Sequence, residues 1–238
     1  MDKRCIVICD SGIGGLRLLR RLEHTLKGQT LLYYADFENL PYGNKSGDEL
    51  VKIAEKNLEK FLPFCPKTVV FACNTLSTNT LGKTNPHGVR LVRVLPKVKV
   101  GKRGLLLCTE ATANSDYVRL LKKENSLLDV LPVKGLAEEI EKWVRCGKKI
   151  NLEGMLRCAD RDYGYVSLGC THYPIIQAEL KKLFPLAEFL SGEEDAFDKI
   201  VNSVTTIDTD DHGSEVCFIG KEAKMLKTLY NKGIFENV

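Results

Sequence analysis

The sequence has no long hydrophobic run and no strong excess of one charge. Its 238 residues carry 35 lysines and arginines against 31 acidic residues, a formal net charge of +4. The basic residues are spread along the chain rather than gathered with aromatics, which disfavours nucleic-acid binding. The first apolar run, Cys5 to Cys9, is too short for a signal peptide or a membrane span. We therefore predict a cytoplasmic protein that binds neither nucleic acid nor membrane.

Paired cysteine motifs are also missing. The nine cysteines are scattered and form no C-x-x-C pair, and their share of the chain is below the ~8–10% that is typical of a disulfide scaffold. This usage indicates a reducing compartment. Cys170 and His172 stand close together but lack the further spaced ligands of a tetrahedral zinc site. We predict no metal.

The composition is that of an ordinary globular protein, with 44% hydrophobic and 28% charged residues. Apolar β-branched runs alternate with helical patterns along the whole chain. We expect strands at 5–9, 30–35, 68–72, 89–94, 104–108, 126–132, 164–168 and 215–220, and helices at 16–26, 48–61 and 135–144, after Thr109 and after Pro174. This alternation predicts an α/β fold of parallel sheets flanked by helices.

A segment with little apolar periodicity, Pro96 to Gly104, interrupts the alternation and reads as a hinge. The length of the chain suits two domains of about 100–120 residues. We place the first domain at 1–96 plus 208–238, where a late strand returns to it, and the second at 97–207. Both are expected to be mainly parallel sheets flanked by helices, and similar to one another.

Two cysteines end matching strand patterns. Cys73 lies in F-A-C-N-T and Cys170 in L-G-C-T-H, each after an apolar run and before small polar residues that can begin a helix. Open α/β sheets bind ligands at the carboxyl ends of their strands. A lone cysteine there is more often a packed thiol, but two in matching contexts suggest a pair facing one substrate. Such a pair suits a reaction that removes a proton from one face of a carbon and returns it to the other.

The glycine-rich turn D-S-G-I-G-G, Asp10 to Gly15, lacks the G-x-G-x-x-G spacing of a dinucleotide site. A carboxylate at the strand end would also repel phosphate. The turn suits an amino acid better, with Asp10 near an ammonium or a catalytic proton and Ser11 near a carboxylate. A helix N-cap explains this segment equally well. A cysteine hydrolase in which His172 activates one thiol is a further interpretation, but it leaves the second cysteine without a role.

Five ordered blocks resemble the glutamate racemases of the cofactor-independent aspartate/glutamate racemase superfamily. They are D-S-G-I-G-G-L at 10–16, Y-A-D at 34–36, P-Y-G at 41–43, A-C-N-T at 72–75 and L-G-C-T-H-Y-P at 168–174. The resemblance implies a two-domain enzyme with its active site in the interdomain cleft. It implies interconversion of L- and D-glutamate without a cofactor, to supply D-glutamate for peptidoglycan, by a protein that forms a homodimer.

The resemblance also implies roles for individual residues. Cys73 and Cys170 match the family's two catalytic cysteines, one a thiolate base and the other a thiol acid, with the roles exchanged in the reverse direction. Asp10 and His172 match the residues that assist them. The implied substrate-binding residues are Asp10, Ser11, Tyr42, Gly43, Asn74, Thr75, Thr112, Thr171 and His172, with Asp36 and Glu138 as less certain members of the site.

The chain departs from the family in three places. It is somewhat short, Leu190 stands where the family commonly has a polar residue, and Leu95 precedes the proline where a glutamate is common. None of these departures touches the thiols. Two other functions stay open: a racemase of another acidic amino acid such as aspartate, and a non-catalytic amino-acid-binding protein on the same scaffold.

Overall fold

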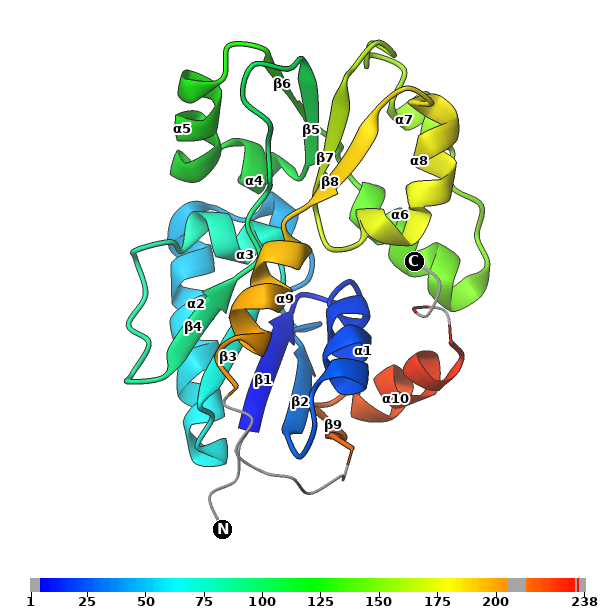
Figure 1. Ribbon diagram of the computed structural model, residues 1–238. Helices are drawn as coiled ribbons and strands as arrows, with labels where there is room; N and C mark the ends of the chain where they lie inside the picture. Colours follow the sequence, from blue (N-terminus) through cyan, green and yellow to red (C-terminus); the bar gives the residue numbers. More distant parts are fainter. Residues whose placement is uncertain (1–4, 205–212, 234, 236–238) are drawn as a thin grey trace.

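Two parallel β-sheets, one above the other in Figure 1, form the frame of the protein. The structure is a computed structural model and describes residues 5–204, 213–233 and 235. The first sheet has the order β4-β3-β1-β2-β9 and the second the order β6-β5-β7-β8. Every strand pair within them is parallel. The predicted α/β fold with two sheets flanked by helices is confirmed.

The first sheet consists of β1 Cys5–Asp10, β2 Thr30–Ala35, β3 Thr68–Phe71, β4 Arg90–Arg93 and β9 Glu215–Ile219. The second consists of β5 Gly104–Cys108, β6 Leu128–Pro132, β7 Tyr165–Gly169 and β8 Glu188–Ser191. The central strands β1, β3, β5 and β7 are buried along their whole length. They are covered on both faces, which is why their sequences are continuous apolar runs rather than alternating ones.

The helices that cover the sheets are α1 Leu16–Thr25, α2 Gly47–Phe61, α3 Asn74–Asn79, α4 Glu110–Ala113, α5 Asp116–Glu124, α6 Leu136–Cys146, α7 Leu152–Met155, α8 Gln177–Leu183, α9 Glu193–Val201 and α10 Ala223–Asn231. Short 3-10 turns lie at η1 Tyr42–Asn44, η2 Leu62–Phe64 and η3 Tyr173–Ile176. Local sequence fixes several of these boundaries. For example, Ser46 and Glu49 form a reciprocal capping box that begins α2 directly after the P-Y-G loop. In the part of the chain that the structure describes, no helix is long and apolar enough to cross a membrane.

In each sheet the first strand has neighbours on both sides, because the chain adds one strand to one side of it and a later strand to the other. In the first sheet β1 lies between β2 and β3, and in the second β5 lies between β6 and β7. Such a switch point leaves a crevice at the carboxyl ends of the two central strands. Ser11 follows β1 and Cys73 lies two residues beyond the end of β3 in the first sheet, whereas Thr109 and Cys170 follow β5 and β7 in the second. Topology therefore delivers one thiol to each crevice.

The chain crosses between the sheets twice. Residues 94–103 lead from β4 to β5, and α9, which follows β8, packs against α1 and β4 of the first sheet. Arg21 of α1 forms ion pairs with Glu193 and Glu194 of α9. We propose that the chain returns to the first domain near Gly192; the predicted boundary at 207/208 lies outside the described residues. The sequence analysis missed β8, α9 and α10.

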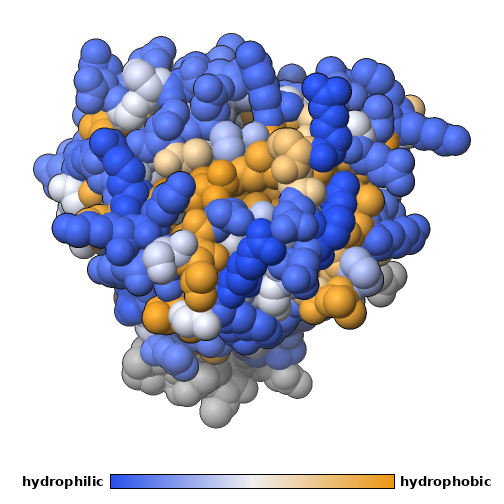
Figure 2. Space-filling model, turned by 90° about the horizontal axis from the view of Figure 1, so that it is seen from above, coloured by the Kyte–Doolittle hydropathy of each residue, from blue (hydrophilic) through white to orange (hydrophobic). Residues whose placement is uncertain are grey.

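The end of the second domain that faces away from the first carries apolar side chains among charged ones (Figure 2). Val100, Leu127 and Leu186, which precede β5, β6 and β8, are exposed apolar residues. Leu190, by contrast, is buried in a hydrophobic cluster of the second domain. It packs there with residues such as Leu106 and Tyr165, so the departure from the family at this position supplies an apolar core side chain.

The two connections touch through their backbones. A Cβ atom on Gly192 would lie 1.6 Å from the carbonyl oxygen of Leu95, and both contacting groups are main chain. Relief of this overlap would require movement of one connection. Glycine at 192 therefore lets the two crossings pass side by side.

We predict that Gly192→Ala lowers the free energy of unfolding by about 1–3 kcal/mol, the usual cost of overpacking. Urea denaturation followed by circular dichroism measures this change. Gly213→Ala is the matched control, since a Cβ there would meet no atom within 4 Å. Equal unfolding midpoints for the two variants would contradict the proposed close crossing.

Candidate functional site

Cys73 follows β3 and is the residue before the first turn of α3. Its side chain is buried, and the Ser11 hydroxyl donates to its Sγ at 3.7 Å. Burial raises the pKa of the Cys73 thiol to about 12, and the negative charge of Asp10 adds to the rise. In this closed arrangement Cys73 is therefore a protonated thiol at neutral pH.

Cys170 follows β7 at the corresponding place in the second sheet, and it has a different partner. Its Sγ lies 3.7 Å from Nδ1 of His172, and Nε2 of the same ring lies 2.9 Å from Oε1 of Glu141. Burial by itself lowers the pKa of His172, but hydrogen bonds with Cys170 and Glu141 outweigh it and raise that pKa well above its usual range. His172 is therefore a buried imidazolium between a sulfur and a carboxylate.

Glu141, on α6, is the acidic residue that contacts His172. The same Oε1 accepts a 2.8 Å hydrogen bond from the backbone N–H of Ile13, in the glycine-rich turn of the first domain. The sequence analysis offered Glu138 as the acidic residue near the second thiol and missed Glu141. Glu138 lies one helical turn earlier and lines the neighbouring cavity. Helical spacing places 138 and 141 on the same face of a helix, so the pattern E-E-I-E was the signal.

The glycine-rich turn approaches the second domain closely. A Cβ on Gly12 would lie 2.1 Å from Oε1 of Glu141, and one on Gly14 would lie 2.4 Å from Oγ1 of Thr171. The glycines therefore serve contact between domains, which the sequence analysis did not anticipate.

Asp10 ends β1 and is fully buried. Its Oδ1 accepts the backbone N–H of Gly12 at 3.0 Å. Burial raises the pKa of Asp10, and the positive charge of His172 opposes that rise. Within the described residues, Asp10 Oδ2 and Thr171 Oγ1 are buried without a hydrogen bond of good geometry, although the Thr171 side chain lies close enough to Asp10 to lower its pKa. Unpaired buried polar groups are uncommon in proteins, and both belong to the predicted substrate-binding set.

Asp36 holds the P-Y-G loop in place. Its carboxylate is buried and accepts hydrogen bonds from the Tyr42 hydroxyl at 2.6 Å, from Asn39 at 2.9 Å and from Asn57 at 3.3 Å. Asp36 itself does not line the cavity between the domains, whereas Tyr42 and Gly43 do. We infer a positioning role for Asp36.

Three threonine hydroxyls join the two domains beside the cavity. Thr75 of α3 and Thr109 lie 2.8 Å apart, Thr109 donates to Thr112 at 2.9 Å, and Thr112 donates to Thr75 at 3.2 Å. Asn74 fixes the start of α3 by donating to the carbonyl of Val94, at the beginning of the first connection. Thr109 was missing from the predicted site residues, although it begins the pattern T-x-x-T that contains Thr112.

A cavity of about 30 Å³ lies between the domains. Its lining includes Ser11, Tyr42, Gly43, Thr109, Lys134, Glu138, Glu141, Cys170 and His172. Cys73 does not line this cavity, but it accepts a hydrogen bond from Ser11, which does. A cavity of this size holds about two water molecules. This cavity is therefore too small, as it stands, for a ligand the size of an amino acid.

Comparison with known proteins agrees with this geometry, although no protein-family model matches the chain. The chain is 35% identical over 209 residues to the glutamate racemase of Carboxydothermus hydrogenoformans. The aligned region covers 78% of this chain and 75% of the relative. A glutamate racemase isoform from Bacillus anthracis has the same fold, with a TM-score of 0.78, 22% identity, and coverage of 98% of this chain and 94% of that one. Glutamate racemase from Francisella tularensis, solved in complex with D-glutamate, gives a TM-score of 0.76 at 21% identity and covers 98% and 95%.

These similarities place the protein among the amino-acid racemases, a class of isomerases. More particularly, the chain belongs to the glutamate racemase family. The resemblance inferred from the five sequence blocks is confirmed.

We predict that His172 stays protonated at neutral pH and that Glu141→Gln lowers its pKa by at least about one unit, because the variant loses a full negative charge at hydrogen-bond distance. Nitrogen-15 NMR of the imidazole ring against pH measures both. Glu138→Gln is the control and should leave the titration of His172 nearly unchanged. An equal shift in the two variants would contradict the pairing with Glu141.

Proposed function

We propose that this protein interconverts L- and D-glutamate, and that Cys73 and Cys170 are the acid and the base of the reaction. The observation that carries the proposal is one buried thiol near the switch point of each sheet, with the two close enough that the charge of Cys170 acts on Cys73. Racemisation needs proton transfer at both faces of the α-carbon, and one side chain does not readily reach both. Two thiols from two domains meet that requirement.

The two thiols have unequal partners. The imidazolium of His172 lies 3.7 Å from the Cys170 sulfur, where it can assist the transfer of a proton. Burial and Asp10 keep Cys73 in its protonated form. In one direction, Cys170 then accepts the α-proton while Cys73 donates its proton to the opposite face. After turnover the protonation states are exchanged, and the reverse reaction starts from there.

The groups around the thiols suit the rest of an amino acid. The second carboxylate oxygen of Asp10 can accept a hydrogen bond from the ammonium group, and the hydroxyl of Thr171 can donate to a carboxylate. Ser11, Tyr42, Gly43, Asn74, Thr75 and Thr112 are the further substrate-binding residues that we propose. Fixed donors of this kind stabilise the negative charge that develops as the α-proton leaves. No cofactor is part of this mechanism.

Closure of the cleft is part of the proposal. The cavity of about 30 Å³ has no room for glutamate in the present arrangement, so the domains must part to bind the substrate and close around it. Closure excludes water from a carbanion-like transition state. The crossing of the two connections at Leu95 and Gly192 is where we place the hinge.

The biological setting of the reaction follows the family. We propose that the product, D-glutamate, enters peptidoglycan, and that the reaction takes place in the cytoplasm. The complex of the Francisella tularensis enzyme with D-glutamate supports the same substrate here. Assembly as a homodimer stays a prediction.

Incubation with L-glutamate in D2O tests the activity. We expect deuterium at the α-carbon together with loss of optical rotation, because the thiol that returns the proton exchanges with solvent. Aspartate assayed in parallel should react far more slowly. Aspartate turnover at the same rate would favour the broader racemase. Binding by calorimetry without isotope exchange under reducing conditions would favour the non-catalytic alternative.

Replacement of either thiol tests the mechanism. Cys73→Ser and Cys170→Ser should each lower kcat for racemisation by at least about a thousandfold, since a serine hydroxyl is a far weaker acid and base at neutral pH. Cys108→Ser, at a buried cysteine of β5 outside the catalytic pair, is the control and should keep most of the activity. Full activity in either of the first two variants would refute the two-thiol mechanism.

A further inference from the structure

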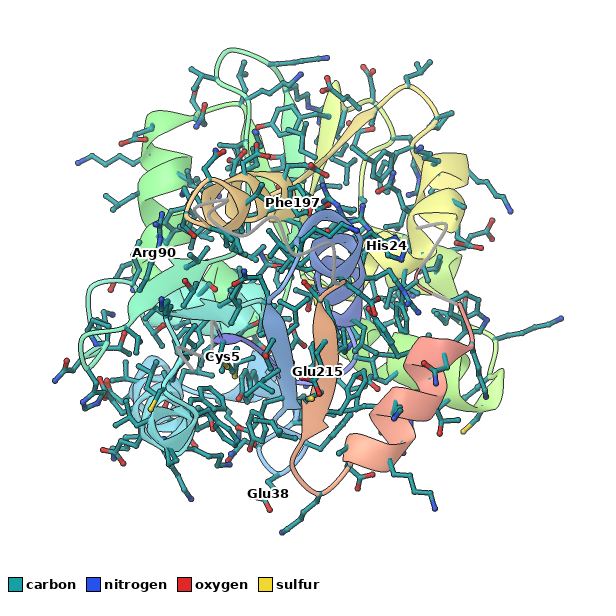
Figure 3. The ribbon with its side chains drawn as sticks, turned by 60° about the horizontal axis from the view of Figure 1, so that its bottom comes forward. Cys5, His24, Glu38, Arg90, Phe197 and Glu215 are labelled. Carbon is teal, nitrogen blue, oxygen red and sulfur yellow. The ribbon has the colours of Figure 1, made fainter. Side chains whose placement is uncertain are left out.

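A second and larger cavity, of about 430 Å³, lies in the first domain away from the catalytic cleft. It lies beyond the carboxyl ends of β2 and β9 and is bounded by the end of α2 and by η2. Its lining consists of Tyr34, Ala35, Phe37, Glu38, Lys60, Pro63, Phe64, Ile219, Gly220, Lys221 and Glu222. Figure 3 shows Glu38 at this end of the molecule, beside the turn between β9 and α10. The volume is within the range of about 300–1,000 Å³ that is typical of small-molecule sites.

The walls of this cavity are largely aromatic and aliphatic. Phe64 is 41% exposed although it is a large apolar residue, and Phe37 is only partly buried. Gly220 allows the turn after β9 to approach Tyr34, because a Cβ there would lie 3.1 Å from the ring. The result is a hollow with flat apolar sides.

A single lysine without an acidic partner faces these walls. The ammonium of Lys60 lies 4.4 Å from the centre of the Tyr34 ring and donates a hydrogen bond to the Tyr34 hydroxyl. Within the described residues, no carboxylate lies within ion-pair distance of Lys60, whereas Lys221 at the rim is paired with Glu38. A cation without a directly paired carboxylate beside aromatic walls is complementary to a ligand that carries both a ring and a negative charge.

The cavity is connected to the catalytic cleft by hydrogen bonds through Asp36. The Tyr34 hydroxyl donates to Asp36 Oδ1 at 3.5 Å, and the Tyr42 hydroxyl donates to Asp36 Oδ2 at 2.6 Å. Tyr42 lines the cavity between the domains. A ligand that shifts Tyr34 or Lys60 therefore acts on the carboxylate that holds the P-Y-G loop.

We propose that this cavity is a second ligand site for a small aromatic anion, a one- or two-ring carboxylate or sulfonate, and that its occupancy alters substrate binding through Tyr34, Asp36 and Tyr42. The effect on substrate binding, which is the second half of this proposal, rests on the proposed function. The existence of the ligand site, which is the first half, does not. The anionic group pairs with Lys60, and the ring lies between Phe37 and Phe64.

Fluorescence titration with 1-anilinonaphthalene-8-sulfonate tests the site on the intact protein. We expect saturable binding at one site, weakened about tenfold by Lys60→Met because a charge-assisted contact is lost. Glu222→Gln removes an acidic residue of the lining and should strengthen binding. Leu186→Ala, at an exposed apolar residue of the other domain, should leave binding unchanged. Equal affinity in wild type and Lys60→Met, or displacement of the probe by D-glutamate alone, would overturn the proposal.

The connection is tested by the KM for glutamate with and without saturating probe. We expect a change of at least about fivefold in KM with kcat unaltered, within the usual range of coupling between sites. Tyr34→Phe should still bind the probe but lose this effect, because the hydroxyl that reaches Asp36 is gone. Probe binding without a change in KM would overturn the connection and leave the site standing. If the protein does not racemise glutamate, the fluorescence titration still decides the first half.

Discussion

One buried carboxylate, that of Glu141, organises the site. Its Oε1 accepts two hydrogen bonds, one from the imidazole of His172 in the second domain and one from the backbone N–H of Ile13 in the first. A charge is costly to bury unless it is paired and hydrogen-bonded, and these two donors supply both. The same contact therefore sets the charge state of the histidine beside Cys170 and fixes how the domains meet. The hydrogen bonds of the two thiols, by contrast, stay within their own domains.

Much of the fold could be predicted from periodicity alone. The strands β1, β3 and β7, which lead to Asp10, Cys73 and Cys170, are central and buried on both faces, so their sequences are continuous apolar runs between turns. The strand β8 was missed because it is a short edge strand with one buried residue, Leu190. The helix α9 was not predicted, and its residues were assigned to the second domain, whereas its partners belong to the first. Local pattern does not reveal which sheet a helix covers.

The site could be predicted where chemistry and chain order coincide, and less well where it depends on packing. Both cysteines and His172 stand out because their residue types are reactive and follow strands. Glu141 lies far along the chain from the turn that it contacts, and nothing local distinguishes it from Glu138. Thr109 was missed for a similar reason, because its role is a hydrogen bond to Thr75 across the domain boundary. Contacts between domains are the part of the site that the sequence conceals.

The glycines at 12 and 14 have a consequence for catalytic geometry. Each occupies a place where the second domain leaves no room for a side chain, Glu141 at one position and Thr171 at the other. The turn therefore acts as a thin spacer between the two sheets, and its thinness sets how far apart the carboxyl ends of β1 and β7 come to rest. In the mechanism that we propose, the distance between the two sulfurs therefore depends on two positions that carry a hydrogen atom in place of a side chain.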